Sequence, residues 1–457
     1  MILDLREIFE ENEKYINETV TVQGWIRNHR KQKSFGFIDF SDGTHQTHLQ
    51  IVYDDSLSTF NEITKLHIGS AITVTGKIIE SAHAGQQIEM QASEVILEGD
   101  CDEEYPIQPK RHTREFLREN AYLRPRTNLF SAVFRVRSKV AYAIHKYFQE
   151  GGYVYFQAPL ITASDCEGAG EMFKVTALDI DNINGKIDYT KDLFSKPTSL
   201  TVSGQLEAET WAMSYKKVYT FGPTFRAENS NTKTHANEFW MIEPEIAFCN
   251  LEQDMDIMED MLKYVVSYTL ENCKEEIDFF DKFVEKGLKD KLVKLISTEF
   301  VRIDHEEVIK ILKQADVKWE FEPEYGEDIA KEHEKYITEY FNGPVFIKNW
   351  PKDIKAFYMK QNDDQKTVAA VDLEIPGVGE LMGGSERETD YDKLTSRMDE
   401  LGMNKAELDW YLNLRRYGGC VHSGFGMGFE RLLIYLTGVE NIRDVIPYSR
   451  TPNNCEY

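Results

Sequence analysis

The sequence contains no run of apolar residues long enough to cross a membrane. A transmembrane helix needs roughly 20 consecutive, mostly apolar residues, and polar residues interrupt every apolar segment well before that length. The first residues, MILDLREIFEENEKYINE, lack the basic and then apolar order of a signal peptide. They also lack the arginine-rich, acid-poor composition of a transit peptide. We therefore expect a cytoplasmic protein with no membrane partner.

Closely spaced cysteine pairs are absent as well. The six cysteines are spread along the chain, and no two of them form a CxxC motif. Disulfide-stabilised domains and zinc sites normally place several cysteines at short, regular spacings. The sequence therefore predicts neither a disulfide framework nor a cysteine-based metal site.

An excess of positive charge is the third absence, since the formal net charge is −25. A protein that coats a nucleic-acid duplex is usually basic. An enzyme that grips one folded RNA needs only local basic patches, because salt limits exposed charges to a range of roughly 8–10 Å. Two such patches are present, Arg27–Lys33 and Lys110–Arg126, although each is more simply explained as solvated surface when taken alone.

What remains is the composition of a folded protein with several domains. The chain has 457 residues, of which 41% are hydrophobic and 29% are charged. That length exceeds one ordinary domain, and the hydrophobic fraction is sufficient for a large core. We expect two or three domains.

Residues 17–98 have the pattern of short β-strands separated by turns. Segments such as TVTVQGWI, FGFIDF and AITVTGKIIE are β-branched and aromatic, and Ser41, Asp42 and Gly43 mark one of the turns. About five strands in this length favour a small closed barrel of the OB-fold type, which commonly binds single-stranded nucleic acid. We therefore predict an OB-fold domain over residues 1–100.

The rest of the chain divides into a linker and a mixed α and β region. Residues 101–126 contain Pro106 and Pro109 and predict a linker, so the larger domain is expected to span 127–457. Apolar residues recur at helical spacing over 129–149, and a strand is expected over 153–162. Two further strands flank the polar loop at 229–237, and residues 250–345 form a charge-rich, mostly helical block without an assigned role.

Three segments of this larger region occur in a distinctive order. The first is the long helix and the strand that ends near Pro159, the second is Phe-Arg-Ala-Glu at 225–228 followed by Glu-Phe-Trp at 238–240, and the third is GFGMGFER at 424–431. Together they resemble motifs 1, 2 and 3 of the class II aminoacyl-tRNA synthetases. The resemblance implies an α+β fold, in which an antiparallel sheet flanked by helices follows the OB-fold barrel, and a homodimer formed through motif 1.

The resemblance also implies an ATP site with Mg²⁺. Arg226 is expected to hold the α-phosphate and Arg431 the γ-phosphate, since a guanidinium can hold oxyanions through two hydrogen bonds. His235 is a possible second contact of the γ-phosphate. The adenine is expected to stack on Phe239, and Glu228 is expected to accept from its exocyclic amine.

Two carboxylates are implied as the Mg²⁺ ligands. They are Asp372 and Glu380 in the run VDLEIPGVGE. Carboxylate oxygens suit this hard cation, which they would bridge to phosphate. The same run contains Glu374, so the sequence leaves open which of Asp372 and Glu374 is the second ligand.

The amino acid follows from a smaller set of residues. An asparagine pocket must offer one acceptor and one donor to a neutral amide, and Glu243 and Arg387 fit these roles. Ala208 occupies the position at which aspartate enzymes have a lysine that would attract a second carboxylate. The resemblance implies that the α-amino group is bound by three further residues, Glu167, Ser203 and Gln205.

The barrel is expected to bind the anticodon of a tRNA. Phe37 is the aromatic residue that matches the family's stacking position, and Arg27 lies in the adjacent basic patch. Gln50 is the nearest match to the base-recognising glutamine, and Gln46 remains an alternative.

Within the class, the chain most resembles the asparaginyl-tRNA synthetases, which activate asparagine with ATP and transfer it to tRNA. The stretches RAENSNT and EFWMIEPE match asparaginyl enzymes more closely than they match lysyl enzymes. An aspartyl enzyme, whether discriminating or non-discriminating, is an alternative that Ala208 and Glu243 disfavour. A tRNA-independent ligase that forms asparagine is disfavoured by the barrel, and an inactive RNA-binding relative is disfavoured by Arg226, Arg431 and the acidic pair.

Overall fold

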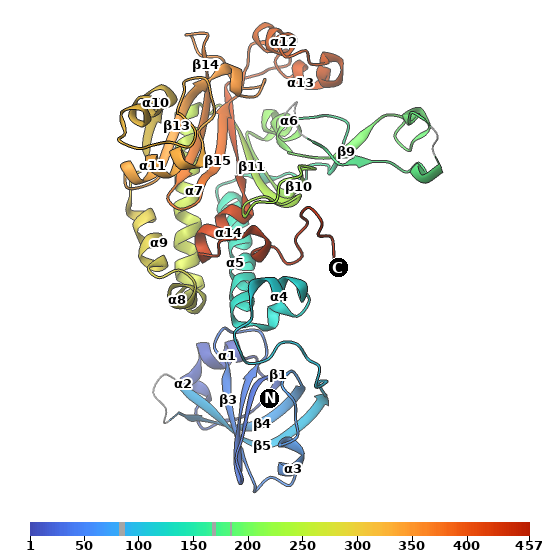
Figure 1. The fold of residues 1–457 in the computed structure, drawn as a ribbon, viewed down its shortest axis with the longest axis vertical. Coiled ribbons are helices and arrows are strands. Elements are labelled where there is room, and N and C mark those ends of the chain that lie inside the picture. Colours follow the sequence, from blue (N-terminus) through green and yellow to red (C-terminus); the bar gives the residue numbers. More distant parts are fainter. Residues whose placement is uncertain (82–86, 167–170, 183–184) are drawn as a thin grey trace. The chain divides into compact units, whose positions relative to one another are not determined.

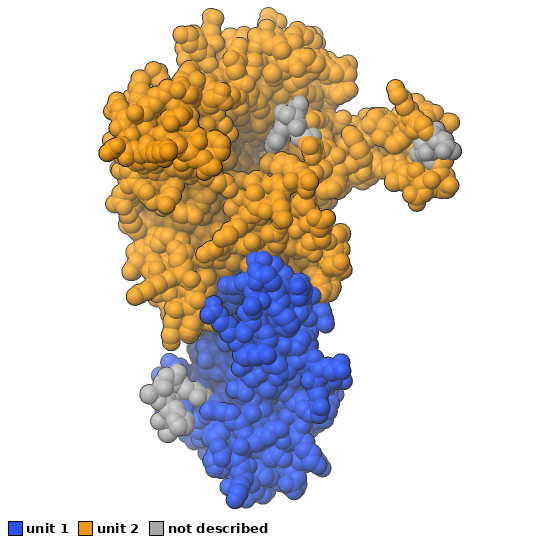
Figure 2. All heavy atoms as spheres, in the orientation of Figure 1, with its two compact units in different colours: residues 1–135 blue, residues 136–457 orange. Residues whose placement is uncertain are grey.

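The computed structural model describes residues 1–81, 87–166, 171–182 and 185–457. The chain forms two compact units, Met1–Arg135 and Val136–Tyr457, which are coloured separately in Figure 2. The division falls inside one long helix, α5 (Asn128–Glu150). The expected domain limits at residues 100 and 126 stay predictions.

Unit 1 contains a closed barrel with the strand order β1-β2-β3-β5-β4 (Figure 1). The strands are β1 Thr19–Lys31, β2 Phe35–Ser41, β3 Leu49–Asp54, β4 Ala71–Glu80 and β5 Ile88–Gly99. Side chains alternate between the interior and the surface, so Ile38 and Phe40 are fully buried while Phe35 is exposed. The predicted five-stranded OB-fold is confirmed.

Four short helices accompany the barrel. They are α1 Leu5–Glu10, α2 Asn12–Tyr15, α3 Phe60–Ile63 and α4 Arg114–Glu119. The residues from 100 to 113 form neither helix nor strand, as the acidic and proline-containing sequence predicts. Thr113 ends this segment and caps α4 by accepting from the backbone N–H of Phe116.

Unit 2 is built on an eight-stranded sheet with the order β12-β13-β14-β15-β16-β11-β10-β6. Its strands are β6 Val154–Tyr155, β10 Lys217–Phe225, β11 Glu238–Ala247, β12 Val301–Asp304, β13 Val345–Pro351, β14 Thr367–Ile375, β15 Gly379–Glu386 and β16 His422–Gly428. The central strands are antiparallel, and β12 and β6 pair in parallel at the two edges. The expected fold class is confirmed, with the addition of these parallel edges.

Helices pack against this sheet, among them α6 on β10 and β11, α7 on β14 to β16, α11 on β14 and β15, and α14 on β11 and β16 (Figure 1). Besides α5, the helices of unit 2 are α6 Gln205–Tyr215, α7 Leu251–Asn272, α8 Lys274–Phe283, α9 Leu288–Ser297, α10 His305–Gln314, α11 Lys331–Tyr340, α12 Tyr391–Glu400, α13 Asp409–Asn413 and α14 Phe429–Thr437. Among the described residues, none of these helices is sufficiently long and apolar to span a bilayer.

The chain between α5 and α6 differs from the expected single strand over 153–162. It forms two strands of two residues each, β6 and β7 (Ile161–Thr162). Pro159 lies between them and has no N–H to donate to a sheet, so the chain leaves the large sheet after Tyr155. Strand β7 then pairs with β9 (Thr198–Leu200), which also pairs with β8 (Lys174–Val175), in a separate small sheet that projects from unit 2 (Figure 1).

Candidate active site

All six residues predicted to bind ATP line one cavity of about 130 Å³ in unit 2. They are Arg226, Glu228, His235, Phe239, Glu380 and Arg431. The first four come from the end of β10, the following loop and the start of β11, while the last two come from β15 and α14. The second and third motifs therefore meet at this cavity.

The pairing of β10 with β11 positions Arg226 beside Phe239. Phe225 lies opposite Glu238 in the ladder, and the next hydrogen bond runs from the Arg226 N–H to the Asn237 carbonyl at 3.0 Å. The Arg226 guanidinium lies 5.3 Å from the centroid of the Phe239 ring. A cation and an aromatic face are thus available side by side, as a phosphate and an adenine require.

Arg431 lies in the first turn of α14 and reaches across to β15. Its Nη1 donates to the Glu380 carbonyl at 2.7 Å and lies 3.4 Å from Glu380 Oε2. The Arg431 side chain is 32% exposed, so it can bind a phosphate without leaving a buried site. Its hydrogen bond to the Glu380 backbone orients it toward the cavity.

His235 is held in the loop by a hydrogen bond between its Nδ1 and Thr232 Oγ1. Partial burial lowers the pKa of His235, and the positive charges of Arg431, Lys331 and Arg226 lower it further. His235 is therefore mainly neutral at pH 7, and a nearby phosphate would favour its protonation.

Glu430 joins the three motifs and was not predicted from the sequence. Its side chain is almost fully buried and accepts from Arg137 Nη2 of α5 at 2.8 Å and from the Trp240 backbone N–H of β11 at 2.9 Å. The Arg137 guanidinium also lies 4.7 Å from the ring centroid of Phe429. One carboxylate of α14 thus connects all three motifs.

The two predicted magnesium ligands face the same small space. A methyl group on Gly383 would lie 3.2 Å from Asp372 Oδ1 and 3.3 Å from Glu380 Oε1. Among the described residues, no set of three acidic, histidine or cysteine side chains is arranged to hold a metal. Two carboxylates fit Mg²⁺ nonetheless, because this ion commonly binds one or two carboxylates and takes its other ligands from phosphate and water.

Asp372 and Glu374 differ in their surroundings. Asp372 and Glu380 both line a second cavity, which adjoins the ATP cavity and is described below, and Asp372 Oδ2 lies 2.6 Å from Lys355 Nζ. Glu374 is 2% exposed and lines no described cavity. Burial and the neighbouring carboxyl groups of Glu334, Glu380 and Asp372 raise its pKa well above the ordinary value. Asp372 is the better placed of the two, because it faces the cavity together with Glu380.

Glu334 shows that the helical block 250–345 reaches the ATP cavity. It lies on α11, and its carboxylate accepts from the backbone N–H of Glu380. Burial and the Glu380 charge raise the pKa of Glu334 to about 7. From the same helix, Lys331 Nζ donates to Thr234 Oγ1 at 3.2 Å, in the loop that contains His235. The sequence assigned no role to this block.

A second cavity of about 350 Å³ contains the residues predicted to bind the amino acid. Ser203, Gln205, Glu243 and Arg387 line it. Glu167, the other predicted contact of the α-amino group, lies outside the described residues. Four residues line both this cavity and the ATP cavity, namely Arg226, Met241, Glu380 and Gly426. The two cavities therefore meet at Arg226.

Glu243 lies on β11, its side chain faces the start of α6, and it is 5% exposed. It accepts from the Ser203 hydroxyl and, at 3.0 Å, from the Gly204 backbone N–H. Ser203 Oγ in turn accepts from the Gln205 backbone N–H at 3.1 Å. These bonds fix the Glu243 carboxylate in the cavity wall, where its remaining lone pairs can accept from an amide.

Arg387 also lines this cavity and is buried. Its Nε donates to Glu245 Oε2 at 3.3 Å, its Nη2 pairs with Glu245 Oε1, and its Nη1 donates to Ser385 Oγ at 2.7 Å. Glu245, Gly424 and Ser385 lie opposite one another on β11, β16 and β15. Since a side chain at Gly424 would collide with Glu245, this glycine leaves room for the pair.

Ala208 is turned away from the cavity. It packs in an apolar cluster with Phe156, Ala212 and Val218. The residue of α6 that extends toward Arg387 is Glu209, which also accepts from Gln205 Nε2 at 3.1 Å. One turn of helix separates Gln205 and Glu209, so they share a face.

In unit 1, three residues gather on the barrel surface. The Arg30 guanidinium lies 5.0 Å from the Phe37 ring centroid, and Arg30 Nη2 donates to Gln50 Oε1 at 2.9 Å. Gln46 lies elsewhere, because its Nε2 donates to the Asn128 carbonyl and its Oε1 accepts from Arg135. The geometry thus groups Gln50, rather than Gln46, with the aromatic residue.

Arg27 does not join this group. It lines a separate cavity of about 450 Å³ in unit 1, together with Asp39, Lys110 and Arg126. Its Nη1 donates to the Arg126 carbonyl at 3.1 Å. Arg30, which the sequence did not single out, is the arginine beside Phe37.

Comparison with known families matches almost the whole chain. Residues 113–452 match the family described as tRNA synthetases class II (D, K and N). Residues 20–98 match the family described as OB-fold nucleic acid binding domain.

Among curated proteins, the chain is 59% identical over 460 residues to an asparagine--tRNA ligase of Acholeplasma laidlawii, covering 99% of both chains. It is 53% identical to an asparagine--tRNA ligase of Clostridium tetani, covering 100% of this chain and 99% of the other. A crystal structure of asparaginyl-tRNA synthetase from Pyrococcus horikoshii, complexed with asparaginyl-adenylate, is similar with a TM-score of 0.85 and 31% identity over 97% of both chains.

Proposed function

Because the chain belongs to the class II tRNA synthetases of the aspartate, lysine and asparagine group, we propose that it is an asparagine-activating member. It uses ATP to convert L-asparagine to asparaginyl-adenylate and then transfers asparagine to its tRNA. The observation that supports this most directly is the meeting of two cavities at Arg226. One has cationic and aromatic groups suited to ATP, and the other has an acceptor and a donor suited to an amide.

The junction between the cavities suits the first chemical step. A carboxylate oxygen of asparagine attacks the α-phosphorus of ATP, a new P–O bond forms, and pyrophosphate leaves with the electrons of the broken bond. Arg226 is the cation nearest both reactants and neutralises charge that grows on the α-phosphate. Arg431 holds the far end of the triphosphate, which fixes the direction of departure.

Asp372 and Glu380 are the residues that would hold Mg²⁺. When bound, the ion neutralises negative charge on the phosphates. Lys355 pairs with Asp372 at 2.6 Å and keeps that carboxylate ionised despite its burial, which raises the pKa of Asp372 to about 6. Glu334 accepts from the Glu380 backbone and so holds the other ligand in position.

The choice of amino acid follows from two residues that line the second cavity. Glu243 accepts from the amide nitrogen of asparagine, and Arg387 donates to the amide oxygen. Aspartate would place a second carboxylate next to Glu243, where the like charges repel. Gln205 and Ser203 are the described residues that bind the α-amino end.

In the second step, a terminal ribose hydroxyl of the tRNA attacks the acyl carbon of the adenylate, and AMP leaves. We assign anticodon binding to Phe37, Gln50 and Arg30 on the barrel. Phe37 offers a ring for a base to stack on, and Arg30 offers a charge for the adjacent phosphate.

A cytoplasmic homodimer is also part of the proposal. Tyr155, Leu160, Ile161 and Trp211 are each about 40% exposed around the end of the first motif. Large exposed apolar groups of this kind commonly mark an interface. The expected solution mass is that of two chains, and a monomer by light scattering at micromolar concentration would contradict it.

ATP–pyrophosphate exchange measured with asparagine and with aspartate tests the activation step. We expect asparagine to support exchange with a kcat/KM at least about 10²-fold above that for aspartate. Equal or faster exchange with aspartate would favour an aspartyl enzyme. Release of free asparagine from aspartate and ammonia would favour the tRNA-independent ligase.

Phe37→Ala tests the assignment of the barrel. We expect the kcat/KM for tRNA aminoacylation to fall by about 10- to 50-fold, because stacking of one base on an aromatic side chain contributes about 1–3 kcal/mol. Pyrophosphate exchange should stay unchanged. Trp25→Ala removes another exposed aromatic of the barrel and is the matched control. An equal fall in exchange would contradict the assignment.

A further inference from the structure

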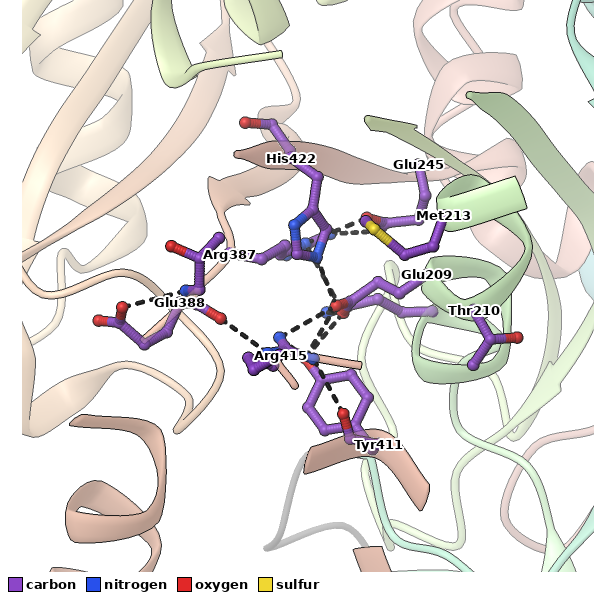
Figure 3. A network of polar contacts seen from close by, with 12 residues as sticks. Glu209, Thr210, Met213, Glu245, Arg387, Glu388, Tyr411, Arg415 and His422 are labelled. Carbon is purple, nitrogen blue, oxygen red and sulfur yellow. Dashed lines mark hydrogen bonds and ion pairs between the residues drawn. The ribbon is translucent and has the colours of Figure 1, made fainter. Parts of the chain in front are cut away.

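A network of buried polar side chains lies behind the amino-acid cavity (Figure 3). Its centre is Glu209, whose side chain is fully buried and does not line the cavity. Figure 3 shows Arg415, Tyr411 and His422 directed toward this carboxylate. These three residues come from α13, the turn that follows it and β16, so the network joins distant parts of unit 2.

The Glu209 carboxylate lies within hydrogen-bonding distance of three polar side chains. Arg415 Nη2 lies 3.3 Å and His422 Nε2 lies 2.8 Å from Glu209 Oε2, and the Tyr411 hydroxyl lies 2.9 Å from both carboxylate oxygens. Burial alone opposes ionisation of Glu209, but His422, Arg415 and Arg387 outweigh it and lower its pKa to about 2. The buried carboxylate is therefore charged at neutral pH.

His422 is positioned to support this charge. Its Nε2 lies 2.8 Å from the Glu209 carboxylate, and its Nδ1 lies 2.8 Å from the Cys420 carbonyl. Both partners are acceptors, so the ring donates a hydrogen bond to at least one of them in either protonation state.

Two further contacts lead from Glu209 to the cavity wall. Gln205 Nε2 donates to Glu209 Oε1 at 3.1 Å, and Arg387 Nε lies 4.0 Å from the same oxygen. Gln205 and Arg387 both line the cavity. Glu209 thus contacts the groups at the two ends of the proposed asparagine site without touching the substrate itself.

The charges around Arg387 indicate what Glu209 contributes. Glu245 pairs with Arg387 directly, and Glu209 supplies a second carboxylate at 4.0 Å. Burial disfavours the Arg387 cation, but Glu245 and Glu209 raise its pKa. Without the charge of Glu209, the cations Arg387 and Arg415 would lose a carboxylate partner, and Glu245 would remain beside Arg387. The floor of the cavity would then attract a carboxylate.

We propose that Glu209 is a positioning residue that sets the preference for asparagine over aspartate, by holding Gln205 and Arg387 and by cancelling positive charge beneath the cavity. It adds a determinant that lies behind the residues in contact with the substrate, and it rests on the function proposed above. Its effect is electrostatic as well as geometric, and the two contributions are separable by substitution.

Glu209→Gln removes the charge and keeps the size. We expect the KM for asparagine to rise and the kcat/KM ratio of asparagine to aspartate in pyrophosphate exchange to fall by about tenfold or more, partly through faster exchange with aspartate. The KM for ATP should stay within about twofold of the parent value. Asp192→Asn is the matched control, because Asp192 is a buried carboxylate that accepts backbone N–H bonds and lines neither cavity.

Two further variants separate charge from shape. Glu209→Asp keeps the charge and Tyr411→Phe removes only a donor, so each should keep the asparagine-to-aspartate ratio within about threefold of the parent value. If Glu209→Gln does not fold, a ratio that falls by more than about tenfold in folded Tyr411→Phe, which leaves the charge and the length of Glu209 intact, overturns the proposal. An unchanged ratio in folded Glu209→Gln overturns it as well. Failure of the parent chain to support exchange with asparagine would instead contradict the proposed function.

Discussion

The two cavities that meet at Arg226 differ in how exposed their charged side chains are. In the ATP cavity, Arg431 is 32% exposed and Glu380 is 45% exposed, and both stay accessible to solvent. In the amino-acid cavity, Arg387 is 3% exposed and its partner Glu245 is fully buried. One side offers accessible charge to a highly charged ligand, and the other pairs its charges within the protein.

This difference explains how one site can bind ATP tightly and still select asparagine. A triphosphate brings several negative charges and needs cations that it can reach. Asparagine is neutral in its side chain, and its competitor differs by one charge, so the protein must present hydrogen-bonding groups without excess positive charge. Buried, paired groups satisfy that requirement because they cannot reorganise to suit the wrong ligand.

The largest effect is expected on the ATP side. Arg226→Ala should lower the kcat/KM for pyrophosphate exchange by about 10³-fold or more, because it removes a cation placed where charge develops in the transition state. Lys233→Ala is the control, since Lys233 belongs to the same loop but forms an exposed ion pair with Glu440. A fall in kcat/KM of less than about tenfold for Arg226→Ala would contradict the role of Arg226 in neutralising charge on the ATP side.

A smaller and more selective effect is expected on the amino-acid side. Glu243→Gln should lower the kcat/KM for asparagine by about 10²-fold, mainly through KM, because the carboxylate that accepts from the amide is lost. The KM for ATP serves as the internal reference and should not change. If both KM values rose together, the cavities would not be independent in the way that their lining residues indicate.

The smallest effect concerns a carboxyl group behind the amino-acid cavity. Asp254 is fully buried, and neither of its oxygens has a hydrogen-bond partner among the described residues. Burial raises its pKa to about 7. The folded state therefore binds a proton that the unfolded state has released, and stability falls as the pH rises from about 4 to about 7.

Asp254→Asn should remove this fall in stability with rising pH, because the asparagine side chain carries no proton to release. We expect the variant to be more stable than the parent by on the order of 2 kcal/mol at pH 8, with little difference at pH 4, in urea unfolding. Asp256→Asn, on the exposed face of the same helix, should change stability by less than about 1 kcal/mol at either pH. We expect the free energy of unfolding of the parent chain to fall, relative to that of Asp254→Asn, as the pH rises from 4 to 7. A rise in this difference would contradict the prediction.

Local sequence patterns predicted much of this fold. The alternation in the barrel strands and the helical spacing over 129–149 were sufficient, because each reports burial of one face of a regular element. Three of the apolar residues that recur at helical spacing in α5, Val136, Val140 and Ile144, are fully buried. The split of the strand at 153–162 was missed, because its pairing depends on β9 about 40 residues later.

The site was predictable where residues lie in short stretches that resemble the family, both inside and outside the three motifs. The six ATP residues and four of the five amino-acid residues were assigned from such stretches and line two adjoining cavities. Glu334, Glu430 and Glu209 were missed because their partners are distant in sequence, and nothing near them distinguishes a buried carboxylate from a solvated one. Arg27 was chosen instead of Arg30 for a different reason. A bulge in β1 between Ile26 and Asn28 changes the alternation of side chains, and the sequence does not reveal this bulge.

The position of Glu430 has a consequence for how activity and assembly are linked. Its carboxylate connects α5 to the strand and helix that form the ATP cavity. A displacement of α5 would leave this buried charge without its arginine, which costs several kcal/mol. If a partner that fixes α5 in place favours ATP binding through this contact, thermodynamic reciprocity requires ATP to strengthen the binding of that partner to the same degree.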